Sequence, residues 1–314
     1  MRRGVGVVAL TGASGFIGTA LLTALLEAGY TVRALAHRTP LPAHPSLTPV
    51  RGSLDDAATL AALVEGAETV IHAGGLVVAR RRADFFRINT QATEMLATAA
   101  QQAGVARFLF VSSLAARAPW LSAYAKSKHD AEHLLSHYKT LAWDVLRPPA
   151  IYGPGDANSL PFLRMLARGQ LWLPVKRDAR ISMLHVDDLV RAILAWLSMQ
   201  ASPLRQTYEI ADAAGAYRWD ALVTEAQTAL EHPIHLFTIP RTLALLGVAM
   251  VQGLAYARKR TSFVTIGKIR EMTHADWSVN SEAFCSATGW SPNITIYDGL
   301  RDSMRWVEKQ QNFA

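Results

Sequence analysis

Three side chains in the middle of the chain have the types and spacing needed to move a proton together. Tyr124 and Lys128 are four positions apart, so they would share one face of a helix over 124–138. A tyrosine phenol has a pKa of about 10, and a fixed positive charge nearby favours its phenolate form. Ser113 would offer a hydroxyl to the same reacting oxygen. This set indicates acid–base chemistry on a carbonyl or an alcohol.

A glycine-rich turn near the start of the chain could hold a phosphate. It follows the apolar run 5–10 and opens the first helical pattern. Glycine has no Cβ to block a close approach, and a helix N-terminus presents free N–H groups to an anion. The turn therefore predicts contacts to the pyrophosphate of a dinucleotide from Gly12, Ser14, Gly15, Phe16, Ile17 and Gly18.

The end of the second expected strand is basic. Dinucleotide-binding units that prefer NAD usually carry an acidic residue there, which holds the ribose 2′-hydroxyl. This chain instead has Arg33, His37 and Arg38, with no carboxylate between positions 31 and 39. A guanidinium suits a 2′-phosphate through charge-assisted hydrogen bonds. We therefore expect these three residues to contact the cofactor, and NADP to be preferred over NAD.

The elements that must position these residues alternate regularly through the first half. Strand-like apolar runs cover 5–10, 31–36, 69–72, 107–111 and 143–146. Helical spacing covers 16–28, 57–64, 85–103 and 124–138. Apolar strands joined by helices predict an α/β fold, a Rossmann-like doubly wound parallel sheet with helices on both faces.

This fold class also predicts a division of the chain. Residues 1–155 should form the dinucleotide-binding core, and 156–314 mainly a smaller α+β substrate lobe, with some elements returning to the core. In a parallel sheet the strand ends meet at one edge, so two stretches that follow strand ends there, 52–55 and 72–75, should wall the cofactor groove. The residues expected to form this wall are Ser53, Leu54, Ala73, Gly74 and Gly75.

Composition narrows the classes of protein. Half of the residues are hydrophobic and 18% are charged, which excludes a disordered chain. Cys285 is the one cysteine, so an intrachain disulfide and a Cys-rich metal site are excluded, and a reducing, cytoplasmic setting is expected. The first residues contain no separable secretion signal. No metal is expected.

The formal net charge of +7 raises the question of acidic partners. The basic run 80–82 lacks an aromatic-interleaved strand or a recognition helix, so no nucleic acid is expected. The apolar segment 243–257 is too short to span a bilayer, which takes about 20 apolar residues. Because the basic residues 258–260 follow it, two interpretations stay open, a packed lobe helix and peripheral membrane contact.

Taken together, these motifs resemble the extended short-chain dehydrogenase/reductases, the NAD-dependent epimerase/dehydratase family. Asn89 and the segment 147–155 add to the resemblance, which covers nearly the whole chain. The resemblance implies that Tyr124 is the acid/base and that Ser113 polarises the substrate oxygen. It also implies that Lys128 holds the nicotinamide ribose, and that Asn89, Tyr124, Lys128, Pro148 and Ile151 border the cofactor.

The resemblance further implies a homodimer, paired through the helices at 85–103 and 124–138. Two departures bear on the reaction. Segment 114–123 is shorter than in nucleotide-sugar members, and Leu114 and Ala115 stand where dehydratases carry acids. Dehydration is therefore disfavoured.

The leading hypothesis is an NAD(P)-dependent enzyme that transfers a hydride between the nicotinamide and a small-molecule carbonyl or secondary alcohol. A nucleotide-sugar epimerase of the same family is an alternative, because it would use the same proton-transfer pair. A second alternative is a non-catalytic dinucleotide-binding sensor or scaffold. The intact Tyr124 and Lys128 pair favours an enzyme.

Overall fold

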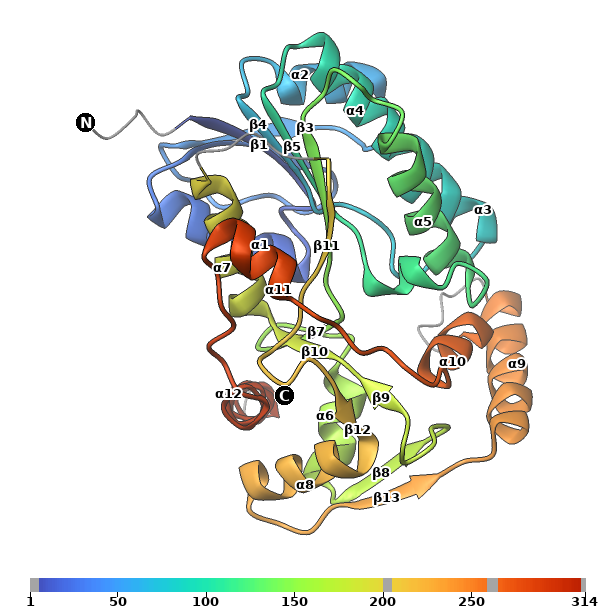
Figure 1. Ribbon diagram of the computed structural model, residues 1–314. Coiled ribbons are helices and arrows are strands. Elements are labelled where there is room, and N and C mark those ends of the chain that lie inside the picture. The colour runs from blue at the N-terminus through green and yellow to red at the C-terminus, as the bar shows by residue number, and fades with distance from the viewer. Residues whose placement is uncertain (1–5, 200–204, 259–264, 312–314) are drawn as a thin grey trace. The chain divides into compact units, whose positions relative to one another are not determined.

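The computed structural model describes residues 6–199, 205–258 and 265–311 (Figure 1). The chain divides into two compact units. The first contains Met1–Arg147 and Ile193–Tyr208, and the second contains Pro148–Ala192 and Glu209–Ala314.

The first unit is built on a seven-stranded sheet in the order β11-β6-β5-β4-β1-β2-β3. The pairs from β6 to β3 are all parallel, with Val8 opposite Val32 on one side and Thr69 on the other. This strand order is the doubly wound one, and it confirms the predicted fold class. The strands are β1 (Val7–Thr11), β2 (Thr31–Ala36), β3 (Leu47–Arg51), β4 (Thr69–His72), β5 (Arg107–Val111), β6 (Trp143–Arg147) and β11 (Thr207–Glu209).

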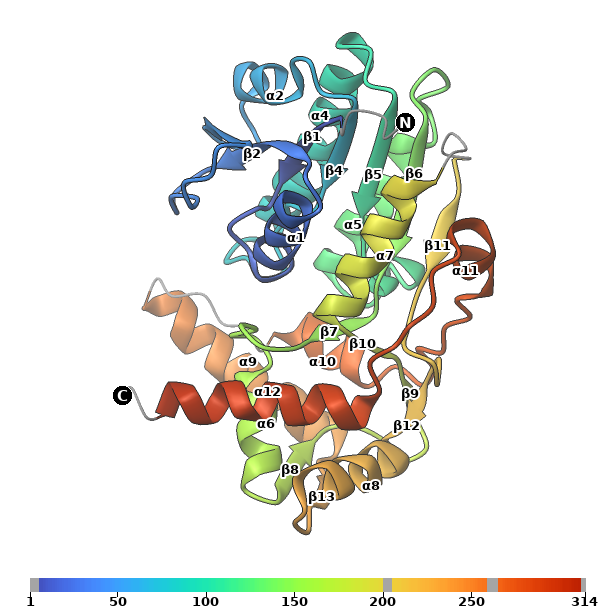
Figure 2. The same ribbon diagram turned by 90° about the vertical axis from the view of Figure 1, so that its left-hand side faces the viewer.

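Helices cover both faces of this sheet. In Figures 1 and 2, α2, α4 and α5 lie on one face and α1 lies on the other. The core beneath α2, α4 and α5 is made by apolar side chains such as Leu63, Leu96 and Phe108, all fully buried. The helical elements are α1 (Phe16–Glu27), α2 (Ala57–Val64), α3 (Arg82–Phe85), the π-helical η1 (Phe86–Gln91), α4 (Ala92–Gln102), the 3-10 turn η2 (Leu114–Arg117) and α5 (Ala123–Leu135).

The expected strands 31–36, 69–72 and 107–111 coincide with β2, β4 and β5. The first expected strand begins at Val5, which lies outside the described residues. Strand β3 was missed because its apolar pattern is weak and it contains Pro49. A proline is tolerated there because β3 is at the edge of the sheet, where one side of the strand needs no hydrogen-bond donors.

A segment distant in sequence returns to this sheet. Helix α7 (Val186–Ser198) begins in the second unit and ends in the first. Trp196 is fully buried there, and its indole N–H donates to the Asp144 carboxylate of β6 over 2.9 Å. The Arg107 guanidinium donates to the carbonyl oxygens of Trp196 and Leu197. Its positive charge therefore offsets the partial negative charge at the C-terminal end of α7.

The second unit combines short sheets with helices around its own core. Strands β7 and β10 pair in parallel, as do β8 and β13, whereas β9 and β12 are antiparallel. Its core contains Leu163, Leu171, Trp219 and Leu300. The elements are β7 (Ala150–Tyr152), α6 (Leu160–Ala167), β8 (Gln170–Leu173), β9 (Arg180–Ile181), β10 (Met183–His185), β12 (Tyr217–Arg218), α8 (Trp219–Leu230), β13 (His235–Thr238), α9 (Arg241–Ala257), α10 (Ile266–Met272), α11 (Glu282–Thr288) and α12 (Ile296–Gln311).

Candidate active site

The glycine turn between β1 and α1 is closely packed against its neighbours. Gly12 has φ +78°, and a Cβ on it would lie 2.7 Å from the backbone of Ala73. A Cβ on Gly18 would lie 1.9 Å from the Gly12 carbonyl oxygen. These two positions therefore require glycine for the packing of helix α1 and the adjacent loop, before any ligand is considered.

The first turn of α1 has room for an anion. Its N-cap, Gly15, provides no side-chain acceptor, and no acidic residue lies in the first turn. Ser14 and Gly15 are exposed, and a Cβ on Gly15 would meet only the Gly12 carbonyl oxygen. Free N–H groups at an open helix N-terminus suit a pyrophosphate, so the residues present fit a dinucleotide. Phe16 and Ile17 are the first residues of that turn.

A fully buried histidine connects this turn to the rest of the first unit. His72, at the end of β4, lies between Thr11, whose Oγ1 is 2.6 Å from Nδ1, and Thr93, whose Oγ1 is 2.9 Å from Nε2. Thr93 donates to the Asn89 carbonyl oxygen, so it must accept from His72 Nε2–H. Nδ1 is then the acceptor for Thr11, which in turn accepts from the Gly74 N–H. This direction of donors requires a neutral imidazole.

The environment of His72 agrees with that protonation state. Burial, followed by the nearby charge of Lys128, lowers the pKa of His72 to about 3. The ring also stacks on Phe110, with centroids 5.3 Å apart. Sequence analysis did not identify His72, although a histidine ending a buried apolar strand between two predicted ligand loops was a usable signal.

Asn89 connects the loop after β4 to α5, the helix that carries Tyr124 and Lys128. Its amide accepts from the Leu76 N–H and donates to the Leu76 carbonyl oxygen and to Ser127 Oγ, all within 3.0 Å. A Cβ on Gly75 would lie 2.9 Å from Asn89 Oδ1 and 3.5 Å from Lys128 Nζ. The amide of Asn89 therefore holds the end of the predicted cofactor loop of Ala73, Gly74 and Gly75 against α5.

Ser113 and Tyr124 belong to consecutive elements at one end of the sheet. Ser113 follows β5 and caps η2, where its Oγ accepts from the Ala115 N–H over 3.2 Å. Tyr124 lies in the first turn of α5, which begins after the N-cap Ser122. Its ring meets Phe85 edge-on, with centroids 6.2 Å apart. Both Ser113 and Tyr124 are half-buried, so a ligand can reach them.

Lys128 is buried one turn further along α5. Its Nζ donates to the Val111 carbonyl oxygen over 2.9 Å and lies 4.6 Å from the centre of the Phe110 ring. Burial lowers the pKa of Lys128 to about 8, and Glu132 opposes that shift. A cation held in this way keeps one position, which a flexible surface lysine would not.

Another turn along, Glu132 forms a buried ion pair that sequence analysis missed. Its carboxylate accepts from the Arg147 guanidinium at Nε over 3.0 Å and at Nη2 over 2.5 Å, and from Ser112 Oγ. Ser112 and Arg147 stand at the ends of β5 and β6, so the pair fixes α5 against the sheet. Tyr124, Lys128 and Glu132 recur every four residues, and that spacing was the available signal.

The residues expected at the end of β2 fall into two groups. The Arg33 guanidinium donates to the carbonyl oxygens of Ala62 and Leu63 at the end of α2, so it is committed to that helix. His37 and Arg38 are exposed in the loop after β2. Among the described residues, Arg38 has no ion-pair partner.

The loop after β3 carries its own polar contacts. Ser53 Oγ donates to the Asp55 carboxylate, which also pairs with Arg87. Leu54 lies close to Gly74, because a Cβ added to Gly74 would lie 3.0 Å from the Cδ1 atom of Leu54. Leu54 therefore lies beside the glycine loop after β4, and the contact of Ser53 and Leu54 with a cofactor stays a prediction.

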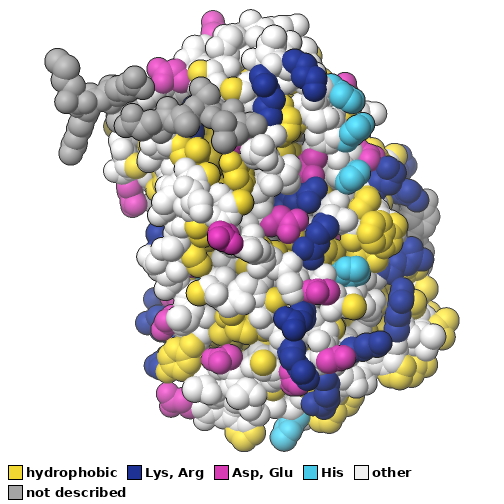
Figure 3. Space-filling model, in the orientation of Figure 1, with side chains coloured by type: hydrophobic (Ala, Val, Ile, Leu, Met, Phe, Trp, Pro, Cys, Tyr) yellow, Lys and Arg dark blue, Asp and Glu magenta, His cyan; other side chains and the backbone are white. Residues whose placement is uncertain are grey.

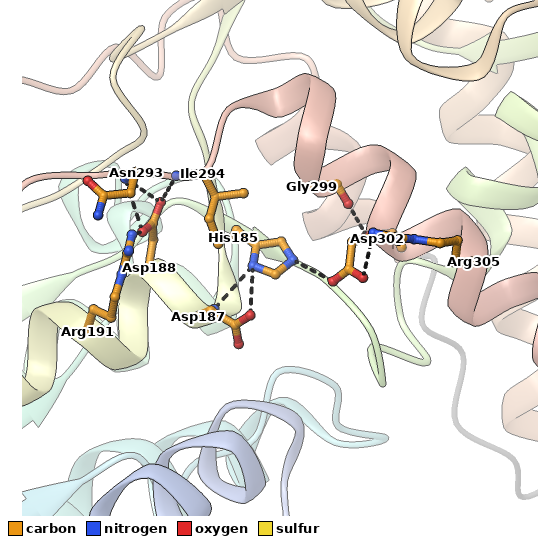
Figure 4. Close-up of polar contacts among 10 residues, drawn as sticks. His185, Asp187, Asp188, Arg191, Asn293, Ile294, Gly299, Asp302 and Arg305 are labelled. Carbon is orange, nitrogen blue, oxygen red and sulfur yellow. Dashed lines mark hydrogen bonds and ion pairs between the residues drawn. The ribbon is translucent and has the colours of Figure 1, made fainter. Parts of the chain in front are cut away.

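In the second unit, His185 and Asp188 anchor the C-terminal helix (Figure 4). His185 is buried, meets Tyr152 edge-on, and lies between the carboxylates of Asp187 and Asp302 at 3.6 and 3.7 Å. Burial lowers the pKa of His185. Asp188 is fully buried, pairs with Arg191 and accepts from the backbone N–H groups of residues 293 and 294. These contacts are structural.

Comparison with known proteins identifies the family. The model of the NAD-dependent epimerase/dehydratase family matches residues 8–211. The chain belongs to this family. It is similar to a ceramide reductase of Caulobacter vibrioides, with 34% identity over 96% of this chain and 94% of the relative. A 3 beta-hydroxysteroid dehydrogenase/Delta 5-->4-isomerase of Mycobacterium tuberculosis is 30% identical over 67% of this chain and 65% of its own.

Solved structures share the fold of this chain. MoeE5 in complex with UDP-glucuronic acid and NAD superposes with a TM-score of 0.75 at 23% identity, and covers 97% of this chain and 99% of its own. As a member of the epimerase/dehydratase family, this protein is a nicotinamide-dependent enzyme of the reductase, dehydrogenase and epimerase class. Pro148 and Ile151 belong to the second unit, and their contact with the cofactor stays a prediction.

The buried His72 predicts a specific loss of stability in acid. The unfolded chain protonates His72 near its ordinary value of 6.5, whereas the folded chain resists protonation until about 3, so its contribution is present above pH 6.5 and lost as pH falls below it. Between about pH 7.5 and about pH 5, wild type should lose about 2 kcal/mol more unfolding free energy than His72→Gln. Denaturant titrations at each pH measure this difference, and parallel pH profiles would refute it.

The buried Lys128 predicts a trade between stability and function. Lys128→Met keeps the apolar stem and removes a charge that burial disfavours, so the free energy of unfolding should rise by about 1 to 2 kcal/mol at neutral pH while turnover is lost. Lys126→Met is the matched control on the same helix, because Lys126 is exposed and pairs with Asp130. That control should change stability by less than about 0.5 kcal/mol. A Lys128→Met protein less stable than wild type would contradict the argument.

Proposed function

We propose that this protein reduces a ketone on a ceramide-type lipid, or oxidises the matching secondary alcohol, with NADP(H) as cofactor. The observation that carries the proposal is the similarity to the ceramide reductase over almost the full length of both chains. The positions of Ser113, Tyr124 and the buried Lys128 around the end of β5 support the same chemistry. In the loop between Ser113 and Tyr124, Trp120 is largely exposed, which suits contact with an apolar substrate.

Each of the three residues has one task. Ser113 donates a hydrogen bond that orients the substrate carbonyl oxygen. Tyr124 Oη holds the proton that this oxygen receives as the carbon–oxygen double bond becomes a single bond, and the phenolate left behind recovers a proton from solvent. The Lys128 ammonium stabilises that phenolate. When bound, the reduced nicotinamide supplies the hydride that the carbonyl carbon accepts.

The preference for NADP(H) rests on the basic loop after β2. Arg38 is exposed there, and no carboxylate between positions 31 and 39 would repel a 2′-phosphate. Arg33 is left out of the proposed contacts because its guanidinium is bonded to α2. His37 adds a second exposed side chain beside Arg38.

Three further hypotheses belong to the same proposal. A homodimer would form through α4 and α5, the helices that the sequence singled out. A cytoplasmic location accords with Cys285 as a free thiol. A lipid substrate would be met at a bilayer, so peripheral membrane contact through 243–257 is retained. Among the described helices, none has both the length and the apolar character to cross a membrane.

The catalytic assignment predicts that Tyr124→Phe retains cofactor binding and loses turnover by at least about a hundredfold, because the transferable proton is gone. The assay follows the absorbance of reduced nicotinamide with a detergent-dispersed ceramide-type ketone, and with a nucleotide sugar as the competing substrate. Tyr138→Phe is the control, since its hydroxyl contacts Thr98 near the far end of α5. Undiminished turnover by Tyr124→Phe, or turnover with the nucleotide sugar alone, would refute the proposal.

The cofactor assignment predicts that Arg38→Ala weakens NADPH binding by about tenfold to a hundredfold and leaves NADH binding nearly unchanged. Fluorescence titrations of both reduced cofactors measure the ratio of the dissociation constants for NADH and NADPH. Arg33→Ala is the matched control and should lower stability without changing that ratio. Equal or tighter NADH binding by wild type would show that Arg38 does not contact the cofactor.

A further inference from the structure

Helix α9 of the second unit is apolar on the side that faces solvent. One stripe, spaced by three and four residues, contains Leu243, Leu246, Met250 and Val251, with 59%, 65%, 77% and 54% of their surfaces exposed. On the opposite side, Val248 is buried and Gln252 accepts from the Ile266 N–H of α10. A helix that is apolar all round is normally covered on all sides, so the outer stripe lacks a cover.

The sequence that contains this helix carries charge of one sign up to Arg270, and Glu271 of α10, the next residue, pairs with Lys268 over 3.3 Å. Between His232 and Arg270 the sequence contains no Asp or Glu. The same span contains six cations, Arg241, Arg258, Lys259, Arg260, Lys268 and Arg270. Six cations without an acid approach the net charge of +7 of the whole chain. In Figure 3, yellow and dark blue side chains lie together at the right-hand edge, where Figure 1 labels α9 and α10.

Cations stand at both ends of the apolar stripe. Arg241 begins α9 and is exposed, and Arg258 follows its last residue and is also exposed. This arrangement lets an apolar stripe enter the acyl region while the two guanidinium groups reach lipid phosphates on either side. The strand before α9, β13, and its partner β8 carry an exposed aromatic pair, Phe237 and Trp172, with ring centroids 4.3 Å apart. Aromatic side chains of this kind favour the membrane interface.

We infer that α9 docks the protein on an anionic lipid bilayer, with its axis parallel to the membrane plane. The helix has 17 residues, so it is about 25 Å long and too short to cross a hydrocarbon core of about 30 Å. The Leu243, Leu246, Met250 and Val251 stripe inserts, and the exposed guanidinium groups of Arg241 and Arg258 pair with phosphate headgroups. The excess of positive charge selects a bilayer over a second copy of this chain, since two such surfaces would repel each other.

This inference extends the proposed lipid reductase function, but it depends on the surface of the second unit alone. Binding is measured by flotation of the full chain with vesicles of phosphatidylcholine, with or without phosphatidylglycerol. Wild type should float only with the anionic vesicles, and added salt should weaken binding. The double variant Leu246→Gln/Met250→Gln should bind at least tenfold more weakly, with an unchanged unfolding midpoint because both side chains are exposed.

Val77→Gln is the matched control, an exposed apolar side chain of the first unit, and should bind like wild type. The docking surface is refuted if wild type ignores anionic vesicles or if the double variant binds equally well. A dimeric mass by light scattering that becomes monomeric in the double variant would assign the stripe to a second copy instead. Tyr124→Phe should float normally, and turnover on detergent-dispersed ketone needs no vesicles, so failure of the docking surface and failure of the proposed reaction are separable.

Discussion

The buried ammonium group of Lys128 is the constraint on which the rest of the first unit depends. Moving a charge out of water costs free energy. Fixed polar or charged partners must offset that cost, because the buried charge otherwise lowers the free energy of unfolding. Here the Val111 carbonyl oxygen, the face of Phe110 and the carboxylate of Glu132 surround it from the strand ends and from its own helix. The strands must therefore end in register with α5, and that register also places Ser113 and Tyr124.

The same edge of the sheet is tied together by a second, uncharged network. Neutral His72 passes hydrogen bonds from the glycine loop through Thr11 to Thr93, and Asn89 continues the connection to α5 through Ser127. The glycine turn before α1 and helix α5 are thus joined by side chains that need not touch a ligand.

The second unit differs from the first in that its surface, more than its core, is unusual. Its core is ordinary for a small α+β lobe, and His185 and Asp188 hold its last helix in place. Its surface is unusual, because α9 leaves an apolar stripe in solvent within a stretch that has only positive charge. The chain is similar to a ceramide reductase, and the proposed substrate is a membrane lipid. A surface that binds a bilayer would bring the enzyme to the membrane that contains this substrate.

The sequence by itself determined the parallel sheet, the glycine turn, the family and the spacing of Tyr124 and Lys128, because these depend on local periodicity and on residue types. The tertiary structure decided which polar side chains are free for a ligand. Arg33 and Asn89 were predicted as ligand contacts, and the structure shows that they also bond α2 and the loop after β4, so their contact with a ligand stays a prediction. The hydrogen bonds of His72, Glu132 and Arg147 join partners 15 to 61 residues apart in the sequence. Burial and such distant pairing are properties of the packed chain, so no local pattern encodes them.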